Sequence, residues 1–383
     1  MGVHYFKKGD VKKMIYLDNA ATTKPSNRVI KLSEEIIKND WINPSALYDG
    51  ALAVSNKIKN ARNIIAELIK VKPSEITFTS GATEGNNTVL RLPMWKNIIV
   101  SNIEHDSVHN TVDSLDNVSV HILDVDNKGK ISEEQLEDIL EKITDKESTL
   151  VSVMSANNEI GTIQNINLIS KICKKYGAKY HIDATQTMGK FDLPYHKADF
   201  VTASAHKFHG LKGIGFLSSK ITLQSYITGG HQENNKRAGT ENTLGILTMA
   251  EALKESYENM ISNSNIVFDL CKEFKNEITK NVPDIIINSD DDNPYILNIS
   301  FKDVNAEALI LMLSLSGIYV SSGSACNSKG TEVSRVLKGI GVPRDYIYGT
   351  IRVSFSPDNT TDEVMAAANE IIHCVDVQRK MRV

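Results

Sequence analysis

The sequence predicts an α/β protein in which a doubly wound, largely parallel sheet is followed by a smaller α+β domain. Short apolar strands alternate with amphipathic helices over most of the chain, which is the pattern of a parallel sheet covered by helices on both faces. From about Ser262 the pattern changes to a long helix followed by further strands and helices. A chain of 383 residues is also too long for one simple core, which favours a large and a small domain.

The predicted strands of the large domain are short apolar runs at Glu75–Thr79, Asn97–Val100, Val118–Leu123, Thr149–Ser155, Lys179–Asp183, Ala198–Ala203 and Gly215–Ser218. Helical periodicity between these strands predicts helices at Ala51–Lys70, Ser132–Ile143 and Asn167–Tyr176. The small domain is predicted to contain Ile266–Asn281, Val304–Ser314, Val333–Ile340 and Thr361–Val377 as helices, and Ile285–Ile287, Ile296–Phe301 and Ile318–Ser321 as strands. We expect residues 1–14 to be an N-terminal extension, residues 15–260 the large domain and residues 261–383 the small one.

The composition argues against several classes of partner. With 43 Lys and Arg against 47 Asp and Glu, the net charge of −4 gives no reason to expect nucleic acid or a membrane surface. The four cysteines lie far apart and form no CxxC pair, which argues against a zinc site or a disulfide framework and favours a reducing compartment. The apolar run around Ala308–Leu315 is too short to span a bilayer. The cytoplasm is the expected location.

A lysine follows one of the predicted strands. Ala198–Ala203 runs into Ser204-Ala205-His206-Lys207 and then into a glycine-containing turn. Ligands of doubly wound sheets bind at the carboxyl ends of the strands, and a partly desolvated lysine there can form an imine with an aldehyde cofactor. The alternative is a solvated turn lysine, as most lysines are.

A carboxylate follows a neighbouring strand. Asp183 ends the run Lys179–Asp183, and a buried carboxylate needs a cation or hydrogen-bond donors near it. The protonated pyridine nitrogen of pyridoxal phosphate is such a cation, and keeping it protonated makes the ring an electron sink. The alternative is an aspartate that caps the following turn.

Two further segments are rich in small residues. Thr79–Asn87 opens a helix after the strand that ends at Thr79, and its backbone N–H groups would suit a phosphate; an ordinary strand-to-helix turn looks similar. Cys326 lies among small polar residues in Ser321–Gly330, where a thiol could reach a bound substrate and act as a nucleophile. An incidental surface cysteine is the alternative.

These segments together resemble the NifS/IscS-type cysteine desulfurases, within the class V aminotransferase family of pyridoxal-phosphate enzymes. The resemblance extends from Ile15 to about Glu370. Its anchors in chain order are Tyr16–Thr23, Asn43–Ala53, Thr79–Asn87, Asn157–Gln164, His181–Gln186, Ser204–Gly215, Arg237–Asn242, Ser321–Ser328 and Ile351–Thr360. The family's fold is the aspartate aminotransferase-like fold, with a mainly parallel seven-stranded sheet and a small α+β domain, so the resemblance implies that fold here.

The resemblance also implies roles for residues near the cofactor ring. Lys207 resembles the lysine that forms the Schiff base with pyridoxal 5′-phosphate, and Asp183 the partner of the pyridine nitrogen. Gln186 resembles the donor to the phenolic oxygen. His105 resembles the imidazole that stacks on the ring and assists proton transfer.

Other implied roles concern the phosphate and the substrate. The resemblance implies a phosphate site built from Ala82, Thr83, Ser204, His206 and, from the second subunit of a homodimer, Thr240. Asn158 and Arg352 resemble the groups that hold the substrate carboxylate, and Asn158 also counts among the cofactor-binding residues. Cys326 resembles the cysteine that takes up sulfur as a persulfide. No metal ligand is implied.

The implied reaction converts L-cysteine to L-alanine. Lys207 removes the α-proton, and the Cys326 thiolate attacks the substrate sulfur. An iron–sulfur scaffold, a tRNA-thiolation protein and a dedicated biosynthetic enzyme all remain open as acceptors. A selenocysteine lyase or another class V aminotransferase is the alternative enzyme, although transamination needs no thiol at Cys326. A sulfur-relay protein without catalysis is a different class, which the combination of Lys207, Asp183, Gln186 and Cys326 disfavours.

Overall fold

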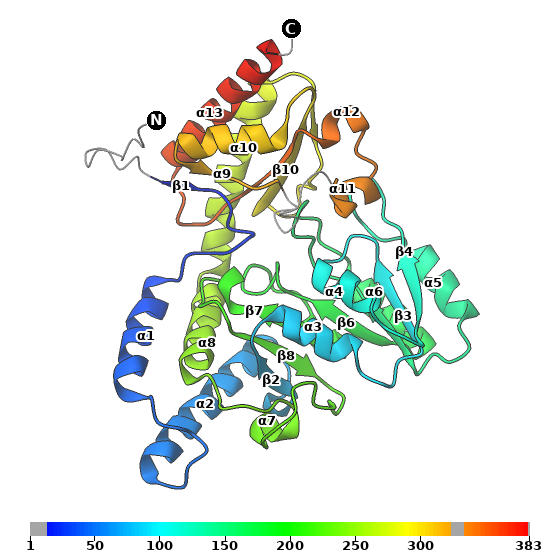
Figure 1. Ribbon diagram of the computed structural model, residues 1–383, viewed down its shortest axis with the longest axis vertical. Helices are drawn as coiled ribbons and strands as arrows, with labels where there is room; N and C mark the ends of the chain where they lie inside the picture. Colours follow the sequence, from blue (N-terminus) through cyan, green and yellow to red (C-terminus); the bar gives the residue numbers. More distant parts are fainter. Residues whose placement is uncertain (1–13, 323–332, 382–383) are drawn as a thin grey trace, which may run out of the picture.

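The computed structural model in Figure 1 describes residues 14–322 and 333–381 and contains a seven-stranded central sheet. In spatial order its strands are β2 (Ile76–Thr79), β8 (Gly215–Ser219), β7 (Phe200–Ser204), β6 (Lys179–Asp183), β5 (Thr149–Ser152), β3 (Asn97–Ser101) and β4 (Ser119–Leu123). The five strands from β7 to β4 run parallel, whereas β8 is antiparallel to both of its neighbours. The predicted mainly parallel sheet of seven strands is therefore confirmed.

Helices cover both faces of this sheet because its strands are apolar on both sides. In β3, Ile99 packs into one core, and Ile98 and Val100 pack into the other, as the two-residue repeat of a strand requires. The first core is covered by α2 (Asp49–Leu68), α5 (Glu133–Lys142), α6 (Ile166–Tyr176) and α8 (Thr243–Glu258), with α1 (Asn27–Asn39) packed on α8. The second is covered by α3 (Ala82–Leu90) and α4 (Asp106–Val112).

The C-terminal part forms a second, smaller layer structure above the central sheet (Figure 1). Its antiparallel sheet has the order β12 (Thr350–Ser354), β10 (Ile296–Phe301) and β9 (Ile285–Ile287). The helices α9 (Met260–Asn281), α10 (Ala306–Leu315) and α13 (Thr361–Lys380) share a core with this sheet. A capping box between Thr360 and Glu363 satisfies the first turn of α13. The predicted small α+β part is confirmed.

The first described residues join this smaller part. The strand β1 (Ile15–Tyr16) pairs in parallel with β11 (Ile318–Tyr319), and Leu17 and Ala20 are buried in the small core. The chain then passes down to α1 beside the large sheet (Figure 1). The residue limits of the two domains stay a prediction, but the segment expected to open the large domain contacts the small sheet first.

The remaining elements are short. They are α7 (Gln232–Asn235), α11 (Arg335–Gly339), α12 (Arg344–Ile347), and the 3-10 turns at Pro73–Glu75, Tyr195–Lys197 and Ala205–Lys207. Among the residues that the structure describes, no helix is both long and apolar enough to cross a membrane.

Candidate active site

A cavity of about 270 Å³ lies where the carboxyl ends of the central strands face the small sheet. This volume is near the lower end of the roughly 300–1,000 Å³ that small-molecule sites occupy. Ten residues predicted for the site line it, namely Ala82, Thr83, His105, Asn158, Asp183, Gln186, Ser204, His206, Lys207 and Arg352. The other described residues of the lining are Ala20, Ala21, Ser107, Met154, Ala156 and Thr185. The structure therefore brings together segments that are spread over most of the chain.

Lys207 lies in the 3-10 turn that directly follows β7. Its Nζ donates to the carbonyl oxygens of Ala20 at 2.7 Å and Ala21 at 2.9 Å. The neighbouring His206 contacts Thr22 Oγ1 through Nδ1 at 3.1 Å, and burial lowers the pKa of His206 to about 4. The His206 imidazole is therefore neutral near pH 7 and adds no positive charge beside Lys207.

Asp183 is the last residue of β6 and is buried. Its carboxylate accepts hydrogen bonds from Asn86 Nδ2 at 2.8 Å and from the Thr185 backbone N–H at 3.0 Å. Both donors are neutral, and no ion pair of Asp183 with lysine or arginine is found within the described part of the chain. A carboxylate buried in this way favours a cation in the adjacent cavity.

A short hydrogen-bond chain ties Asp183 to His105. Asn86 Nδ2 also donates to Ser107 Oγ at 2.9 Å, and Ser107 Oγ contacts His105 Nδ1 at 2.9 Å. The Ser107 backbone N–H donates to the same Nδ1 at 3.0 Å, because His105 caps α4. In the neutral ring this places the proton on Nε2. Asn86 and Ser107 were not predicted as site residues, although Asn86 lies within the segment Thr79–Asn87.

Within the described part of the chain, three buried polar atoms of the cavity lining have no hydrogen-bond partner. They are Gln186 Oε1, Thr185 Oγ1 and Arg352 Nε, while Gln186 Nε2 donates to Ala20 O at 3.0 Å. A buried polar atom without a partner costs about 1–3 kcal/mol. A ligand with several polar atoms would satisfy these groups, and pyridoxal phosphate has such atoms.

The start of α3 forms the opposite end of the cavity. Gly81 precedes the helix with φ of +156°, and the Ala82 N–H donates to Ser204 Oγ at 2.7 Å. A Cβ at Gly81 would approach Ser204 Oγ to 3.1 Å, so the bare backbone permits this close packing. The N-terminus of a helix favours an anion. The donors at this end therefore fit a phosphate group.

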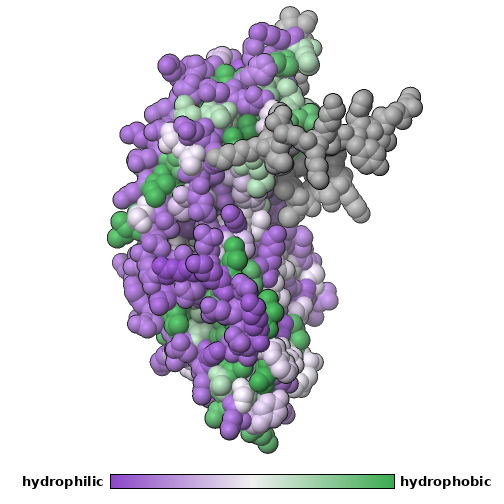
Figure 2. Space-filling model, turned by 90° about the vertical axis from the view of Figure 1, so that its left-hand side faces the viewer, coloured by the Kyte–Doolittle hydropathy of each residue, from purple (hydrophilic) through white to green (hydrophobic). Residues whose placement is uncertain are grey.

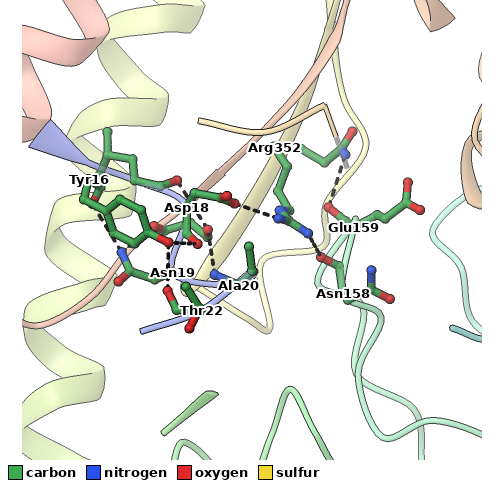
Figure 3. Close-up of polar contacts among 12 residues, drawn as sticks. Tyr16, Asp18, Asn19, Ala20, Thr22, Asn158, Glu159 and Arg352 are labelled. Atoms are coloured by element: carbon green, nitrogen blue, oxygen red, sulfur yellow. Dashed lines mark hydrogen bonds and ion pairs between the residues drawn. The ribbon is translucent and has the colours of Figure 1, made fainter. Parts of the chain in front are cut away.

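Arg352 enters the cavity from β12 in the small sheet (Figure 3). Its Nη2 forms an ion pair with Asp18 Oδ1 at 2.7 Å, and its Nη1 donates to the Asn158 carbonyl oxygen at 2.8 Å. The Arg352 Nε is buried and has no partner among the described residues. Asp18 was not predicted as a site residue, because the two residues are 334 positions apart in the chain.

Cys326 lies outside the described residues, but the described chain on either side of its segment contacts Arg352 and Glu159. Ser321 exchanges two backbone hydrogen bonds with Arg352 (2.6 and 3.1 Å). Ser334 Oγ donates to Glu159 Oε2 at 2.6 Å, next to Asn158. The segment that carries Cys326 therefore begins and ends beside the groups predicted to hold the substrate.

The three other cysteines lie in helices, as predicted. Cys173 is in α6, Cys271 in α9 and Cys374 in α13. Burial raises the pKa of Cys271 to about 12 and that of Cys374 to about 11. Burial also raises the pKa of Cys173. None of these three thiols is available as a thiolate near neutral pH.

Thr240 lies outside the cavity, on the exposed surface. Its segment is anchored by ion pairs from Arg237 to Glu84 at 3.0 Å and from Arg62 to Glu233 at 2.6 Å. The contact of Thr240 with a cofactor in a second subunit stays a prediction.

The chain matches the family model described as aminotransferase class-V over residues 15–366. The cysteine desulfurase IscS of Dictyoglomus turgidum is 36% identical over 368 residues, which cover 92% of each chain. A putative cysteine desulfurase IscS 1 of Bacillus subtilis is 34% identical and covers 96% of this chain and 99% of the relative. The X-ray structure of a NifS-like protein from Rickettsia africae superimposes with a TM-score of 0.87 at 31% identity, over 95% of this chain and 99% of the other.

Proposed function

The chain belongs to the class-V aminotransferase family, and within it to the pyridoxal-phosphate-dependent cysteine desulfurases; we propose which of its residues carry each part of that reaction. The observation that supports the proposal is the single cavity in which ten predicted site residues meet. The substrate is L-cysteine, and the products are L-alanine and a sulfur atom passed to an acceptor.

Pyridoxal phosphate, when bound, supplies an electron sink that weakens the bonds at the substrate's α-carbon. The residues present fit it. Asp183 would hold the pyridine nitrogen, Gln186 would donate the second hydrogen of its Nε2 to a ring oxygen, and His105 would cover the ring. The phosphate would bind at the start of α3, where the lining residues are Ala82, Thr83, Ser204 and His206.

Arg352 and Asn158 would orient the substrate. An arginine has five N–H donors, and only two of those of Arg352 hydrogen-bond to Asp18 and Asn158. The others can bind the carboxylate of cysteine in a fixed geometry. Lys207, at the end of β7, would then take the proton from the substrate's α-carbon and later return a proton to the product.

Cys326 would act as the sulfur acceptor within the enzyme. Its thiolate would form a bond to the substrate sulfur while the carbon–sulfur bond breaks, and the electron pair of that bond would stay with the carbon skeleton that becomes alanine. The raised pKa values of Cys173, Cys271 and Cys374 support this assignment by elimination.

The protein would work as a homodimer in which Thr240 reaches the partner's cofactor. The exposed position of Thr240 supports this proposal. Figure 2 views the side that carries α1 and α2, where hydrophobic side chains are interspersed among polar ones in the lower part. The large exposed apolar residues of this region are Ile30, Ile37, Trp41, Leu47, Tyr48 and Leu52. These exposed apolar side chains lie on one side of the molecule and support a protein interface there.

The sulfur would pass to a second protein in the cytoplasm. The chemistry fits an iron–sulfur scaffold or a tRNA-thiolation protein, because each takes sulfur from a persulfide. The proposal includes no nucleic acid or membrane partner, consistent with the net charge of −4.

A cysteine pulse tests the assignment of Cys326. The holoenzyme should form alanine and carry one extra sulfur on Cys326, detected by mass spectrometry of peptides. Cys326→Ser should still bind pyridoxal phosphate and L-cysteine. It should form no persulfide, and its turnover should fall at least about 100-fold, because the serine hydroxyl stays protonated near pH 7. Cys271→Ser is the matched control and should keep wild-type turnover. Full turnover in Cys326→Ser would show that another nucleophile or a lyase reaction operates.

A further inference from the structure

Arg352 is held from two sides in the small sheet. The Asp18 carboxylate lies 2.7 Å from Nη2, and the Asn158 carbonyl oxygen lies 2.8 Å from Nη1 (Figure 3). The side chain of Arg352 is 3% exposed and that of Asp18 is 20% exposed. The ion pair is therefore largely shielded from water. The attraction between the two charges is stronger in such surroundings than in water, so the pair orients the guanidinium of Arg352.

The backbone of Asp18 is fixed by its neighbours. Asp18 forms a bridge with Ser354, two residues beyond Arg352 on the same strand. The Tyr16 hydroxyl donates to the carbonyl oxygens of Asp18 at 3.1 Å and Thr22 at 2.9 Å. Asn19 Nδ2 donates to Ser354 O at 2.9 Å. Because both members of the ion pair are attached to one ladder, their separation is set by the backbone.

The same segment also contacts the large domain's side of the cavity. The Ala20 and Ala21 carbonyl oxygens accept from Lys207 Nζ, and Ala20 O also accepts from Gln186 Nε2. Residues 16–22 therefore form a bridge between Arg352 and Lys207. This bridge fixes the group that would bind the substrate carboxylate relative to the group that would act at its α-carbon.

Asp18 could support Arg352 permanently or occupy it until a substrate carboxylate displaces it. The geometry favours permanent support, because the bridge between Asp18 and Ser354 holds the backbone of Asp18 beside Arg352. Among residues 14–322 and 333–381 the buried Nε of Arg352 also lacks an acceptor, so a substrate carboxylate has a donor to bind without displacing Asp18. A guanidinium held in place loses less conformational freedom when the substrate binds.

We propose that Asp18 is a positioning residue for recognition of the substrate carboxylate, acting through Arg352. This proposal rests on the proposed function, because it assumes that Arg352 binds the carboxylate of L-cysteine. Removal of the Asp18 charge should weaken the binding of ligands that carry a carboxylate. The binding of amines without a carboxylate should not change.

The test compares L-alanine with ethylamine, which is the same molecule without its carboxylate. Binding of each to the pyridoxal-phosphate-loaded protein is followed by the change in visible absorbance. Asp18→Asn should raise the Kd for L-alanine about tenfold. The Kd for ethylamine should change less than twofold. KM for L-cysteine should rise about tenfold, with kcat changed by less than threefold. Asp358→Asn, the same charge change on an exposed residue near the segment, should alter neither ligand.

A second variant removes the fixation without touching the charge. Tyr16→Phe loses the hydroxyl that binds the Asp18 and Thr22 carbonyl groups. The Kd for L-alanine should therefore rise about threefold, while the Kd for ethylamine stays unchanged. Tighter L-alanine binding in Asp18→Asn would overturn the proposal in favour of a displaceable carboxylate. Equal weakening of both ligands, or no change in either, would also overturn it. Alanine formation from L-cysteine by the wild-type protein tests the proposed function separately. If the wild type forms no alanine, the proposed function is wrong; if it does, the binding results test the role of Asp18 alone.

Discussion

Glu104 is a buried carboxyl group next to the cavity lining. It is 4% exposed and accepts hydrogen bonds from Ser101 Oγ at 2.5 Å and the Met154 N–H at 3.0 Å. Burial raises the pKa of Glu104 to about 8, and the negative charge of Asp183 adds to the shift. Glu104 therefore keeps its proton in the folded protein at pH values where the unfolded chain has lost it.

This difference predicts a pH-dependent stability. Because the folded pKa is the higher one, stability is lost as the pH rises from the unfolded value of 4.5 to about 8. Glu104→Gln removes this titration. Near pH 4.5 the free energy of unfolding of the variant should equal that of the wild type. At pH 8 it should be higher by a few kcal/mol, because each pKa unit corresponds to about 1.4 kcal/mol. Urea unfolding at both pH values measures this. Glu134→Gln on the exposed face of α5 is the control, and a pH-independent difference for Glu104→Gln would contradict the prediction.

At the residue scale, the sequence predicted those groups whose position follows from a strand end. Lys207, Asp183 and Ser204 could be placed because each follows or ends a recognisable apolar strand. Asp18 could not be predicted, since its role depends on an ion pair across 334 positions. Glu104 carries no sequence signal of its burial, because a carboxyl group is usually exposed.

At the scale of elements, α3 lies unusually close to β7. A Cβ at Gly85 would lie 2.7 Å from Thr202 Cγ2. The Thr202 hydroxyl donates to Asn86 Oδ1 at 2.6 Å, and Asn86 in turn holds Asp183. Gly85 therefore permits the close packing that places the start of α3 beside the buried carboxylate.

Gly85→Ala should destabilise the protein by about 1–3 kcal/mol through overpacking, although alanine is favoured over glycine within a helix by about 1 kcal/mol. Thr202→Ser removes the contacting methyl group and keeps the hydroxyl. In the Thr202→Ser background, Gly85→Ala should lower the free energy of unfolding by at least about 1 kcal/mol less than it does in the wild type. A double-mutant cycle of denaturant unfolding measures this difference. An equal cost in both backgrounds would show that Thr202 is not the obstacle.

The predicted elements were most accurate where the residue pattern was strongly periodic. The strands β6 and β10 have the predicted limits, and α2, α5 and α6 begin and end within two residues of them. The helix α8 and the strand β12 were not predicted. Both are buried on most sides, so neither shows the one-sided apolar pattern by which an element is recognised.

At the scale of the whole molecule, the active site depends on contacts between distant parts of the chain. The N-terminal segment pairs with β11 and packs in the small core, yet its carbonyl groups contact Lys207 and Gln186. The sequence predicted two domains and a site at the carboxyl edge of the large sheet. It could not predict that residues 16–22 would connect them, because long-range pairing leaves no local signal.

The assignment of Lys207 is tested most directly by identifying the lysine that binds the cofactor. Reduction of the pyridoxal-phosphate-loaded protein with borohydride fixes the bond between cofactor and lysine, and peptide mass spectrometry then locates it. We expect the label on Lys207, and we expect Lys207→Ala to lose both the label and the visible absorbance. Lys190 is the discriminating alternative, because it is buried and burial lowers its pKa to about 7. A label on Lys190 in the wild type, or a fully labelled Lys207→Ala protein, would contradict the account.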